Sequence, residues 1–196
     1  NLAIIARNAE LINREGDEIS RTHGVQVIPI VADLSTMNGI KFATEKAVSN
    51  LGEIDILINN AGAIPAGSIN VVDDRTVNES WDLKLHGYIR MAREFLPSMR
   101  YRKWGRIVNI TGMAGIQPSA GYIFGGPANA ALMNFTKGLA LEVAKDGVLV
   151  NAVNPGPIQT DRYEEMTATR ADQAGFSIEK QLSLQVKEVP LGRIGR

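Results

Sequence analysis

The chain has 196 residues, 44% of them hydrophobic, which is enough for one globular domain with a sizeable core. Its 21 Lys and Arg residues balance 21 Asp and Glu residues, so no net positive charge favours nucleic acid or anionic lipid as a partner. The absence of cysteine excludes disulfides and thiolate zinc sites, and 2 histidines are too few for a His-based metal cluster.

The first predicted element is a strand at residues 2–6, because this apolar run shows no polar alternation, as in a parallel strand buried on both faces. The run lacks the basic start and the long apolar stretch of a signal peptide. No apolar run in the chain approaches the roughly 20 residues needed to span a bilayer. We therefore expect no membrane partner and a cytoplasmic location.

Strands and helices alternate along the rest of the chain. Further strands are predicted at residues 25–31, 54–58, 107–110 and 148–153, and helices at residues 9–22, from a cap at Ser35 to Leu51, at 78–102 and at 122–144. Strands separated by helices of about ten or more residues indicate right-handed crossovers and a parallel sheet covered on both faces. The sequence therefore predicts a doubly wound α/β fold, with a single domain over residues 1–196.

Local signals set the boundaries of these helices. The hydroxyl of Ser35 is suited to accept from the free amides of a first helical turn, and Gly24 and Gly52 are suited to end helices. Pro97 predicts a kink or an early end in the long helix that contains it. The polar stretch 161–185 has no strong strand pattern and is suited to a mobile lid over a ligand.

Polar residues and glycines gather where the predicted strands end. The turn Asn59-Asn60-Ala61-Gly62 closes the third strand, Asp33 ends the second, Thr111 ends the fourth, and residues 154–160 follow the fifth. Ligands of open α/β sheets collect at this edge, where Gly62 lets a backbone approach closely and Asn59 offers a donor and an acceptor. Taken alone, the turn is equally explained by the tolerance of Asn and Gly for positive φ; its neighbours favour a ligand site.

These motifs resemble those of the short-chain dehydrogenase/reductase (SDR) family over nearly the whole chain. The resemblance rests on Asp33-Leu34, the Asn-Asn-Ala-Gly turn, residues 105–109 and residues 155–160. It implies that Asp33 faces the adenine of a nicotinamide cofactor, and that Ile158 and Thr160 hold its carboxamide. The full set of predicted cofactor-binding positions is Arg7, Asp33, Leu34, Asn59, Ala61, Gly62, Pro155, Gly156, Ile158 and Thr160.

Arg7, directly after the first strand, bears on the choice of cofactor. Dinucleotide folds that bind NAD place an acidic residue there for the ribose hydroxyls, whereas a guanidinium suits a 2′-phosphate. NADP(H) is therefore favoured over NAD(H). The alternative is a surface arginine without a ligand.

Two parts of the family pattern fall outside the sequence. The family's first strand and its Gly-rich, pyrophosphate-binding turn precede residue 1, and its last strand would follow Arg196. In the family the first strand lies at the centre of the sheet, so its loss would leave unpaired edges in the core. We expect the sequence to be a fragment of a longer protein, or its ends to be unrecorded.

The four catalytic positions of the family are all substituted. The resemblance implies a Tyr that donates the proton, a Lys that lowers the pKa of that Tyr, a Ser that holds the carbonyl oxygen and an Asn that holds a water. The matching positions are Gly125 for Tyr, Asn129 for Lys, Gly112 for Ser and Lys84 for Asn. Because Asn and Lys have changed places, we interpret the site as a rearranged relay.

Tyr122 lies three residues before Gly125, nearly one helical turn, so its phenol reaches the same pocket if the helix extends that far. We predict that Tyr122 is the acid/base, with Lys84 lowering its pKa and Asn129 holding water. The alternatives are an interface aromatic for Tyr122, a solvated helix residue for Lys84 and a polar filler for Asn129.

No residue replaces the Ser equally well. Thr111 is adjacent to Gly112, but strand alternation turns its hydroxyl to the other face, and Ser119 lies on a loop that can reach the pocket. His86 is better explained as a packed helix residue than as a catalyst.

The favoured function is an NADP(H)-preferring, SDR-like oxidoreductase that moves a hydride between nicotinamide and a small-molecule carbonyl or alcohol substrate. The alternative is a catalytically inactive or non-redox member, acting as a cofactor sensor, a scaffold or an inactive subunit. The family resemblance also implies a homodimer or homotetramer packed through the helices at 78–102 and 122–144. The substrate pocket is expected to be partly apolar, lined by Met113, Ala120, Ile123 and Phe124.

Overall fold

The computed structural model describes residues 1–195, apart from the side chains of Arg162 and Gln173. The chain divides into two compact units, Asn1–Val153 and Asn154–Arg196. All five predicted strands lie in the first unit, and the predicted lid lies in the second. The single domain over residues 1–196 stays a prediction.

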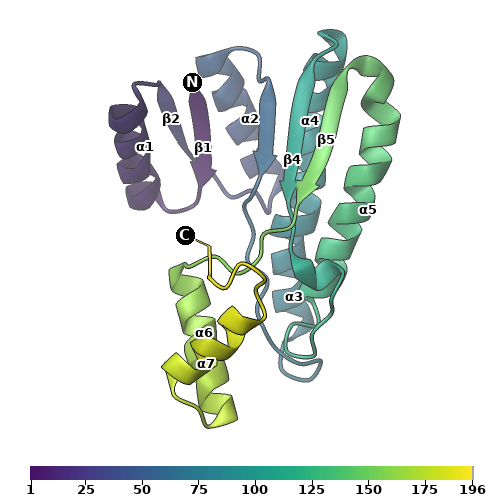
Figure 1. Ribbon diagram of the computed structural model, residues 1–196. Coiled ribbons are helices and arrows are strands. Elements are labelled where there is room, and N and C mark those ends of the chain that lie inside the picture. Colours follow the sequence, from purple (N-terminus) through teal and green to yellow (C-terminus); the bar gives the residue numbers. More distant parts are fainter. Residues whose placement is uncertain (196) are drawn as a thin grey trace. The chain divides into compact units, whose positions relative to one another are not determined.

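Parallel strands and helices alternate along the first unit (Figure 1). Its strands are β1 (Leu2–Ala6), β2 (Val27–Val31), β3 (Ile56–Asn59), β4 (Gly105–Ile110) and β5 (Val148–Val153). Its α-helices are α1 (Ala9–His23), α2 (Met37–Leu51), α3 (Asp74–Trp81), α4 (Gly87–Tyr101) and α5 (Gly125–Val143). Its other helical turns are a π-helix (Asp82–His86) and two 3₁₀-helices (Met113–Gly115 and Ala144–Asp146). The alternation confirms the predicted doubly wound α/β fold.

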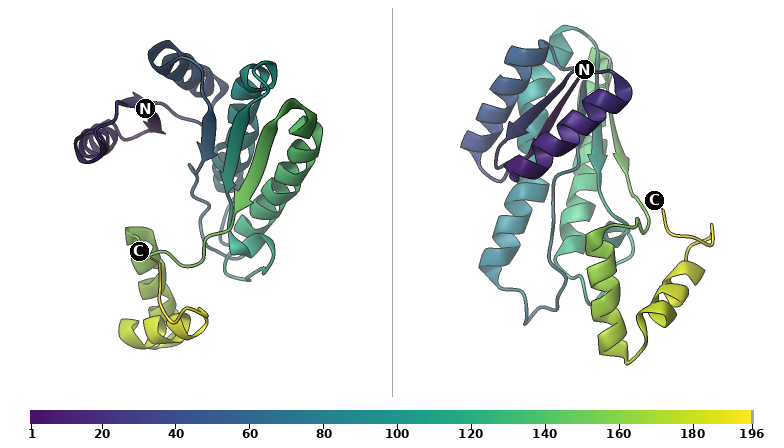
Figure 2. Two further views of the ribbon diagram at one scale, coloured as in Figure 1. Left: turned by 45° about the horizontal axis from the view of Figure 1, so that its top comes forward. Right: turned by 90° about the vertical axis from the view of Figure 1, so that its left-hand side faces the viewer.

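The strands form two parallel sheets, β1–β2 and β3–β4–β5 (Figure 2). In the larger sheet β4 is central, and its Asn109 pairs with Asn59 of β3 and with Ala152 of β5. Among the described residues, β1 and β3 are not hydrogen-bonded to each other. Because all strands of a parallel sheet point the same way, the segments that follow β3 and β4 begin at one edge of the larger sheet.

One hydrophobic core joins both sheets to α2, α4 and α5. Ile40, Met99 and Ile107 are among its fully buried side chains, and burying a side chain of this size stabilises the fold by about 1.5–3 kcal/mol. Helix α1 packs on the opposite face of β1–β2, where Gly16 lies close to Ile4 and leaves no room for a large side chain.

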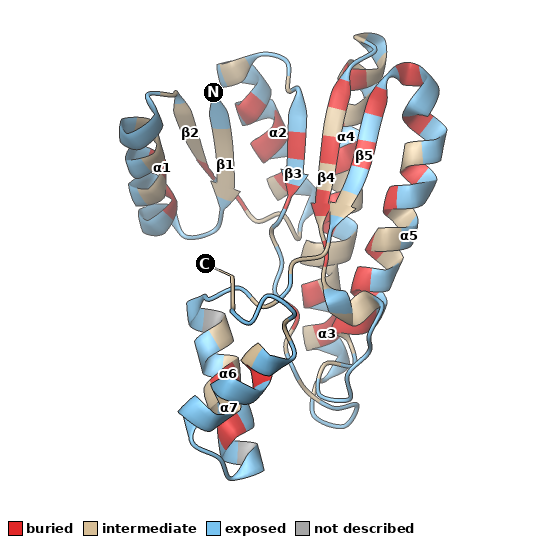
Figure 3. Ribbon diagram, in the orientation of Figure 1, coloured by how far each residue is buried: buried red, intermediate tan, exposed pale blue. Residues whose placement is uncertain are grey.

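The prediction of a sheet covered on both faces is only partly right. It holds for β1–β2, but in β3 Ile56 is 55% exposed and Ile58 is 60% exposed (Figure 3). Leu57, which points to the other face, is buried in the core. No described residue covers the face that carries Ile56 and Ile58. An apolar run predicts a buried strand, but it does not indicate which segment buries it.

The first turn of α2 is capped by Thr36 instead of the predicted Ser35. The Thr36 hydroxyl accepts a hydrogen bond from the amide of Gly39 at 3.0 Å. The Ser35 hydroxyl instead donates to the carboxylate of Asp33, two residues before it, at 2.8 Å. Both residues are good caps, and the competing carboxylate decides between them.

The predicted helix at 78–102 begins earlier, at Asp74, and includes the π-helical turn before α4. Pro97 does not end it, since α4 runs to Tyr101. The start of α5 also differs, since it lies at Gly125 rather than at Tyr122.

The second unit contains two helices, α6 (Asp161–Ala174) and α7 (Ile178–Lys187). The hydroxyls of Tyr163 and Thr167 both donate to the side-chain carbonyl of Gln185, a buried residue, which ties α7 to α6. The predicted lid segment therefore has regular helical structure. Among the described residues of the whole chain, no helix is long and apolar enough to cross a bilayer.

Asp146 links the end of α4 to the turn before β5. Its buried carboxylate accepts from Lys103 at 2.8 Å and pairs with Arg100 at 2.8 Å. The hydrogen bond from Lys103 and the charge of Arg100 lower the pKa of Asp146. The stability that Asp146 contributes is therefore present above the usual carboxyl pKa of about 3.9 and lost as the pH falls through the lower, folded-state value.

We expect Asp146→Asn to lower Tm at pH 7, because the variant removes the charge that both cations face. The difference in Tm between the variant and the unmodified protein should become smaller as the pH approaches 3, because Asp146 then begins to lose its charge. Thermal unfolding at pH 7, 5 and 3 measures this, and a difference that is constant over that range would contradict it.

Candidate active site

Arg7 and Asp33 follow the paired strands β1 and β2. The Asp33 carboxylate accepts from the backbone amide of Ser35 at 3.0 Å and from its hydroxyl at 2.8 Å. These two bonds, with a smaller contribution from the charge of Arg7, lower the pKa of Asp33 and keep it ionised. Arg7 itself is exposed, so its guanidinium is accessible to an anion. Leu34, the next predicted position, is half-buried, and Gly87 of α4 leaves room for its carbonyl.

The side chain of Asn59 points into the core. Its amide nitrogen donates to Asn109 at 2.9 Å, and the amide of Asn109 donates to Thr136 of α5 at 2.9 Å. All three residues are buried. The donor that the sequence suggested for a ligand is thus used within the fold, where it joins β3, β4 and α5.

Gly62 and Lys84 are in direct contact at the end of that turn. A Cβ atom at Gly62 would lie 2.7 Å from Cδ of Lys84, so a larger residue there would displace the lysine. The ammonium group of Lys84 donates to the carbonyl of Ile110, the last residue of β4, at 3.1 Å. Lys84 therefore spans the ends of β3 and β4. Ala61, which precedes Gly62, is half-buried.

Tyr88 is a second phenol beside Lys84. Its hydroxyl also donates to the carbonyl of Ile110, at 3.1 Å, and its ring lies 5.5 Å from the Lys84 ammonium. Burial raises the pKa of Tyr88 well above its usual range. A buried phenol with a raised pKa is a poor proton donor, so Tyr88 is a structural neighbour of the site rather than a candidate acid.

Lys84 lies in the π-helical turn Asp82–His86, which packs against α5. Single π-helical turns within α-helices are frequent at functional sites, because the extra residue redirects side chains. His86 in the same turn is exposed and pairs with Asp82 at 3.0 Å. The prediction that His86 is a packed residue is therefore wrong. His86 faces Asp82 because the two residues are four apart on one helical face.

Tyr122 lies in a turn before α5, not on the helix that the sequence predicted. Its ring nonetheless covers Gly125, because a Cβ atom at Gly125 would overlap the Tyr122 ring. The carbonyl of Tyr122 accepts from the amides of Gly125 and Gly126, at 3.2 and 3.4 Å, at the start of α5. The phenyl ring therefore occupies the space that a side chain at position 125 would enter.

Asn129 and Gly112 lie side by side. A Cβ atom at Gly112 would lie 3.3 Å from the amide nitrogen of Asn129 and 3.5 Å from its carbonyl oxygen. The amide nitrogen donates to the carbonyl of Gly125 at 2.8 Å. The carbonyl oxygen is buried and has no hydrogen-bond partner among the described residues. A buried acceptor without a partner is costly, so this oxygen is suited to a water or ligand hydroxyl.

Neither stand-in for the Ser is strengthened by the structure. The Thr111 hydroxyl donates to Val153 of β5 at 3.2 Å, as strand alternation predicted. Ser119 is exposed, and its carbonyl accepts from the amide of Tyr122.

The remaining predicted cofactor positions lie in the second unit. Ile158 bridges to Gly195 and Thr160 caps α6, while Pro155 and Gly156 lie in the segment before them.

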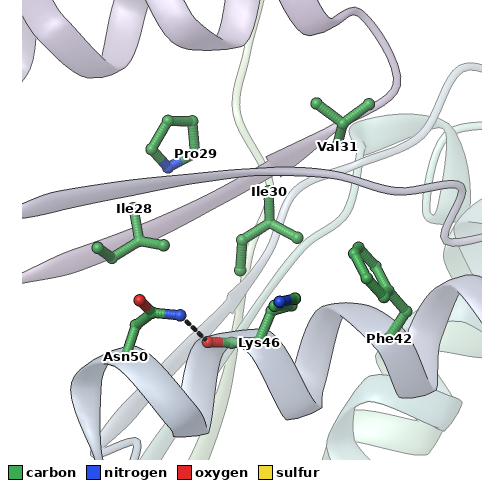
Figure 4. Close-up of a pocket in the computed structure, with 7 residues that line it drawn as sticks. All are labelled: Ile28, Pro29, Ile30, Val31, Phe42, Lys46 and Asn50. Atoms are coloured by element: carbon green, nitrogen blue, oxygen red, sulfur yellow. Dashed lines mark hydrogen bonds between the residues drawn. The ribbon is translucent and has the colours of Figure 1, made fainter.

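Two hollows of the first unit do not involve these residues. One of about 250 Å³ lies between β2 and α2, where the amide of Asn50 is held by the carbonyl of Lys46 (Figure 4). Among the described residues no cluster of His, Asp or Glu could hold a metal ion. The candidate active site is the group of first-unit residues Lys84, Gly112, Tyr122, Gly125 and Asn129.

Two residues near this cluster were missed by the sequence analysis. Tyr88 follows Lys84 by one helical turn, a spacing that places both on one face and was available as a signal. Trp81 donates its indole N–H to the carbonyl of Phe124 at 3.1 Å. No sequence pattern indicated that contact, since the two residues lie 43 positions apart.

The chain is similar to known proteins over most of its length. A family model described as short chain dehydrogenase matches residues 1–171. A 3-oxoacyl-[acyl-carrier-protein] reductase, FabG, from Aquifex aeolicus is 32% identical over 192 residues, covering 98% of this chain and 73% of the relative. The NADPH-dependent reductase BacG from Bacillus subtilis is 29% identical over 199 residues, covering 100% of this chain and 76% of the relative.

Solved structures show the same fold. L-sorbose reductase from Gluconobacter frateurii, complexed with NADPH and L-sorbose, superposes with a TM-score of 0.90 at 29% sequence identity. The match covers 98% of this chain and 74% of that protein. A Rossmann-type arrangement of parallel strands and helices is therefore common to both.

Proposed function

The chain belongs to the short-chain dehydrogenase family, and we propose that it is an NADP(H)-preferring oxidoreductase that acts on a carbonyl or alcohol through a rearranged acid/base set. Its relatives include NADPH-dependent reductases. The observation that supports the rearranged set is the position of the Tyr122 ring over Gly125. A phenol is thus present beside the position where the family carries its proton donor.

In this proposal the glycines at two substituted positions, Gly112 and Gly125, make room for relocated groups. Gly125 accommodates the ring of Tyr122, while Gly62, which belongs to the family turn, accommodates the stem of Lys84. Gly112 faces the side chain of Asn129. Random loss of the catalytic residues would not explain why a phenol and an amide fill the space at these glycines.

Tyr122 is proposed to transfer the proton to or from the substrate oxygen. Lys84 supplies the positive charge of the site and is proposed to favour the phenolate of Tyr122, because a neighbouring cation stabilises the charged form. The partnerless oxygen of Asn129 is proposed to hold a water that replenishes the proton.

The residues at the strand ends are proposed to bind a nicotinamide cofactor. The exposed Arg7 is proposed to bind a 2′-phosphate, and the ionised Asp33 is proposed to face the adenine. Gly62 permits close approach of the backbone, while Ile158 and Thr160 are proposed to hold the carboxamide. The cofactor, when bound, supplies or accepts the hydride. A homodimer or homotetramer also remains our proposal.

A binding titration tests the cofactor preference. We expect the protein to bind NADPH more tightly than NADH, and Arg7→Ala to weaken NADPH binding by about 10-fold while NADH binding stays unchanged. Arg14→Ala is a matched control, because Arg14 is exposed on α1 and pairs with Glu15. Equal losses for both cofactors, or none, would contradict the assignment of Arg7.

One observation favours a second candidate, a cofactor-binding member without redox activity. Gly112 has no hydroxyl, and the hydroxyl of the adjacent Thr111 donates to the carbonyl of Val153. This candidate predicts nucleotide binding without oxidation of NADPH. A screen of carbonyl substrates with cofactor absorbance as the readout separates the two.

A further inference from the structure

The segment that carries Tyr122 is fixed at two carbonyls, one on each side of the tyrosine. The amide of Gly67, in the loop after β3, donates to the carbonyl of Gly121 at 2.8 Å. The indole N–H of Trp81, the last residue of α3, donates to the carbonyl of Phe124 at 3.1 Å. Both donors come from the segment between β3 and the π-helical turn, which is remote in sequence from the segment they hold.

Tyr122 depends on these contacts because it does not lie on a helix. A tyrosine at position 125 would be fixed by the backbone of α5, whose hydrogen bonds begin there. Tyr122 lies in a turn, which its amide closes on the carbonyl of Ser119 at 3.0 Å, and its own carbonyl accepts from the first amides of α5. A turn of this kind opens locally far more readily than a buried helix.

We propose that Trp81 is a positioning residue that holds the Tyr122 phenol over Gly125. The inference rests on the proposed function of Tyr122. Trp81 contacts the loop through its indole N–H and has no assigned contact with substrate or cofactor. Its side chain is half-buried, so the hydrogen bond is partly shielded from water, and the same helix continues directly into the turn that carries Lys84. Trp81 thereby ties the two groups of the proposed acid/base set to one element.

Gly67 supports the second anchor. Its φ of +157° is unusual for a residue with a side chain, and a Cβ atom there would lie 2.5 Å from Val72. A substitution at Gly67 would therefore move the amide that holds Gly121. The two anchors are separate, because Gly67 lies in the loop after β3 and Trp81 is the last residue of α3.

The test is Trp81→Phe, which keeps an aromatic ring and removes the N–H donor. We expect kcat to fall about 10-fold, the scale of one lost hydrogen bond, while KM for NADPH changes less than about 2-fold. We also expect the amides of residues 121–126 to exchange with solvent faster in the resting protein. Trp104→Phe is the matched control, because Trp104 directly precedes β4 and its ring faces the guanidinium of Arg106.

Each outcome decides the proposal. Faster exchange at residues 121–126 with lower kcat supports it, and Gly67→Ala should then shift both readouts in the same direction. Unchanged exchange, or faster exchange with full kcat, would overturn it. If the unmodified protein showed no turnover with any substrate, the proposed function would fail, whereas the exchange comparison of Trp81→Phe with Trp104→Phe would still show whether Trp81 holds the segment.

Discussion

Tyr122→Phe is expected to lower kcat by at least about 100-fold, the lower range of the contribution of a positioned general acid or base. The ring remains, so its packing over Gly125 is kept and only the proton-donating hydroxyl is lost. Cofactor affinity should change little, because the family resemblance assigns no cofactor contact to the phenol. Steady-state kinetics with the best carbonyl substrate, together with an NADPH titration, measure both quantities.

The matched control for this variant is Tyr101→Phe. Tyr101 is 88% exposed at the end of α4, so loss of its hydroxyl should leave kcat unchanged. Tyr88→Phe tests the other phenol near Lys84 and should affect stability more than the chemical step. Full activity in Tyr122→Phe would eliminate the rearranged relay and favour the non-redox candidate or another donor.

The fold was predictable because the period of the hydrophobic pattern is a local property. Short apolar runs such as residues 2–6 and 148–153 are strands in the structure, and the glycines at 24 and 52 follow the ends of α1 and α2. The cap of α2 was missed because its choice depends on a tertiary competitor. Asp33 takes the hydroxyl of Ser35, and Thr36 is left to cap the helix.

The residue types of the candidate site are visible in the sequence, whereas their geometry is not. The exchange of residue types at Lys84 and Asn129 is visible in the sequence, and so are the glycines at 112 and 125. The contact between the Tyr122 ring and Gly125 was expected from a helix that starts at Tyr122. In the structure this helix starts at Gly125, and Tyr122 makes the contact from the turn before it. The turn that carries Tyr122 is hydrogen-bonded to Gly67 and Trp81, which are distant in the sequence. A pattern of a few neighbouring residues does not predict such long-range contacts.

Gly125→Ala is expected to lower kcat about 10-fold or more, although it adds only one methyl group to a helix. The new Cβ atom would overlap the Tyr122 ring, so the phenol must move, and small displacements of a catalytic group are costly. Gly138→Ala is the matched control, since a Cβ atom at Gly138 of the same helix would meet nothing within 4 Å. That control should keep full kcat and gain about 0.5–1 kcal/mol of stability from the higher helix propensity of alanine.

The comparison separates a phenol held over Gly125 from a phenol that merely lies nearby. If Gly125→Ala kept full activity while Tyr122→Phe lost it, Tyr122 would act from a position other than the one over the glycine. The double variant Tyr122→Gly with Gly125→Tyr places the phenol on α5 itself and removes the ring that blocks it. Recovery of activity above the level of Tyr122→Phe would show that the place of the phenol, rather than the residue that carries it, determines the proton transfer.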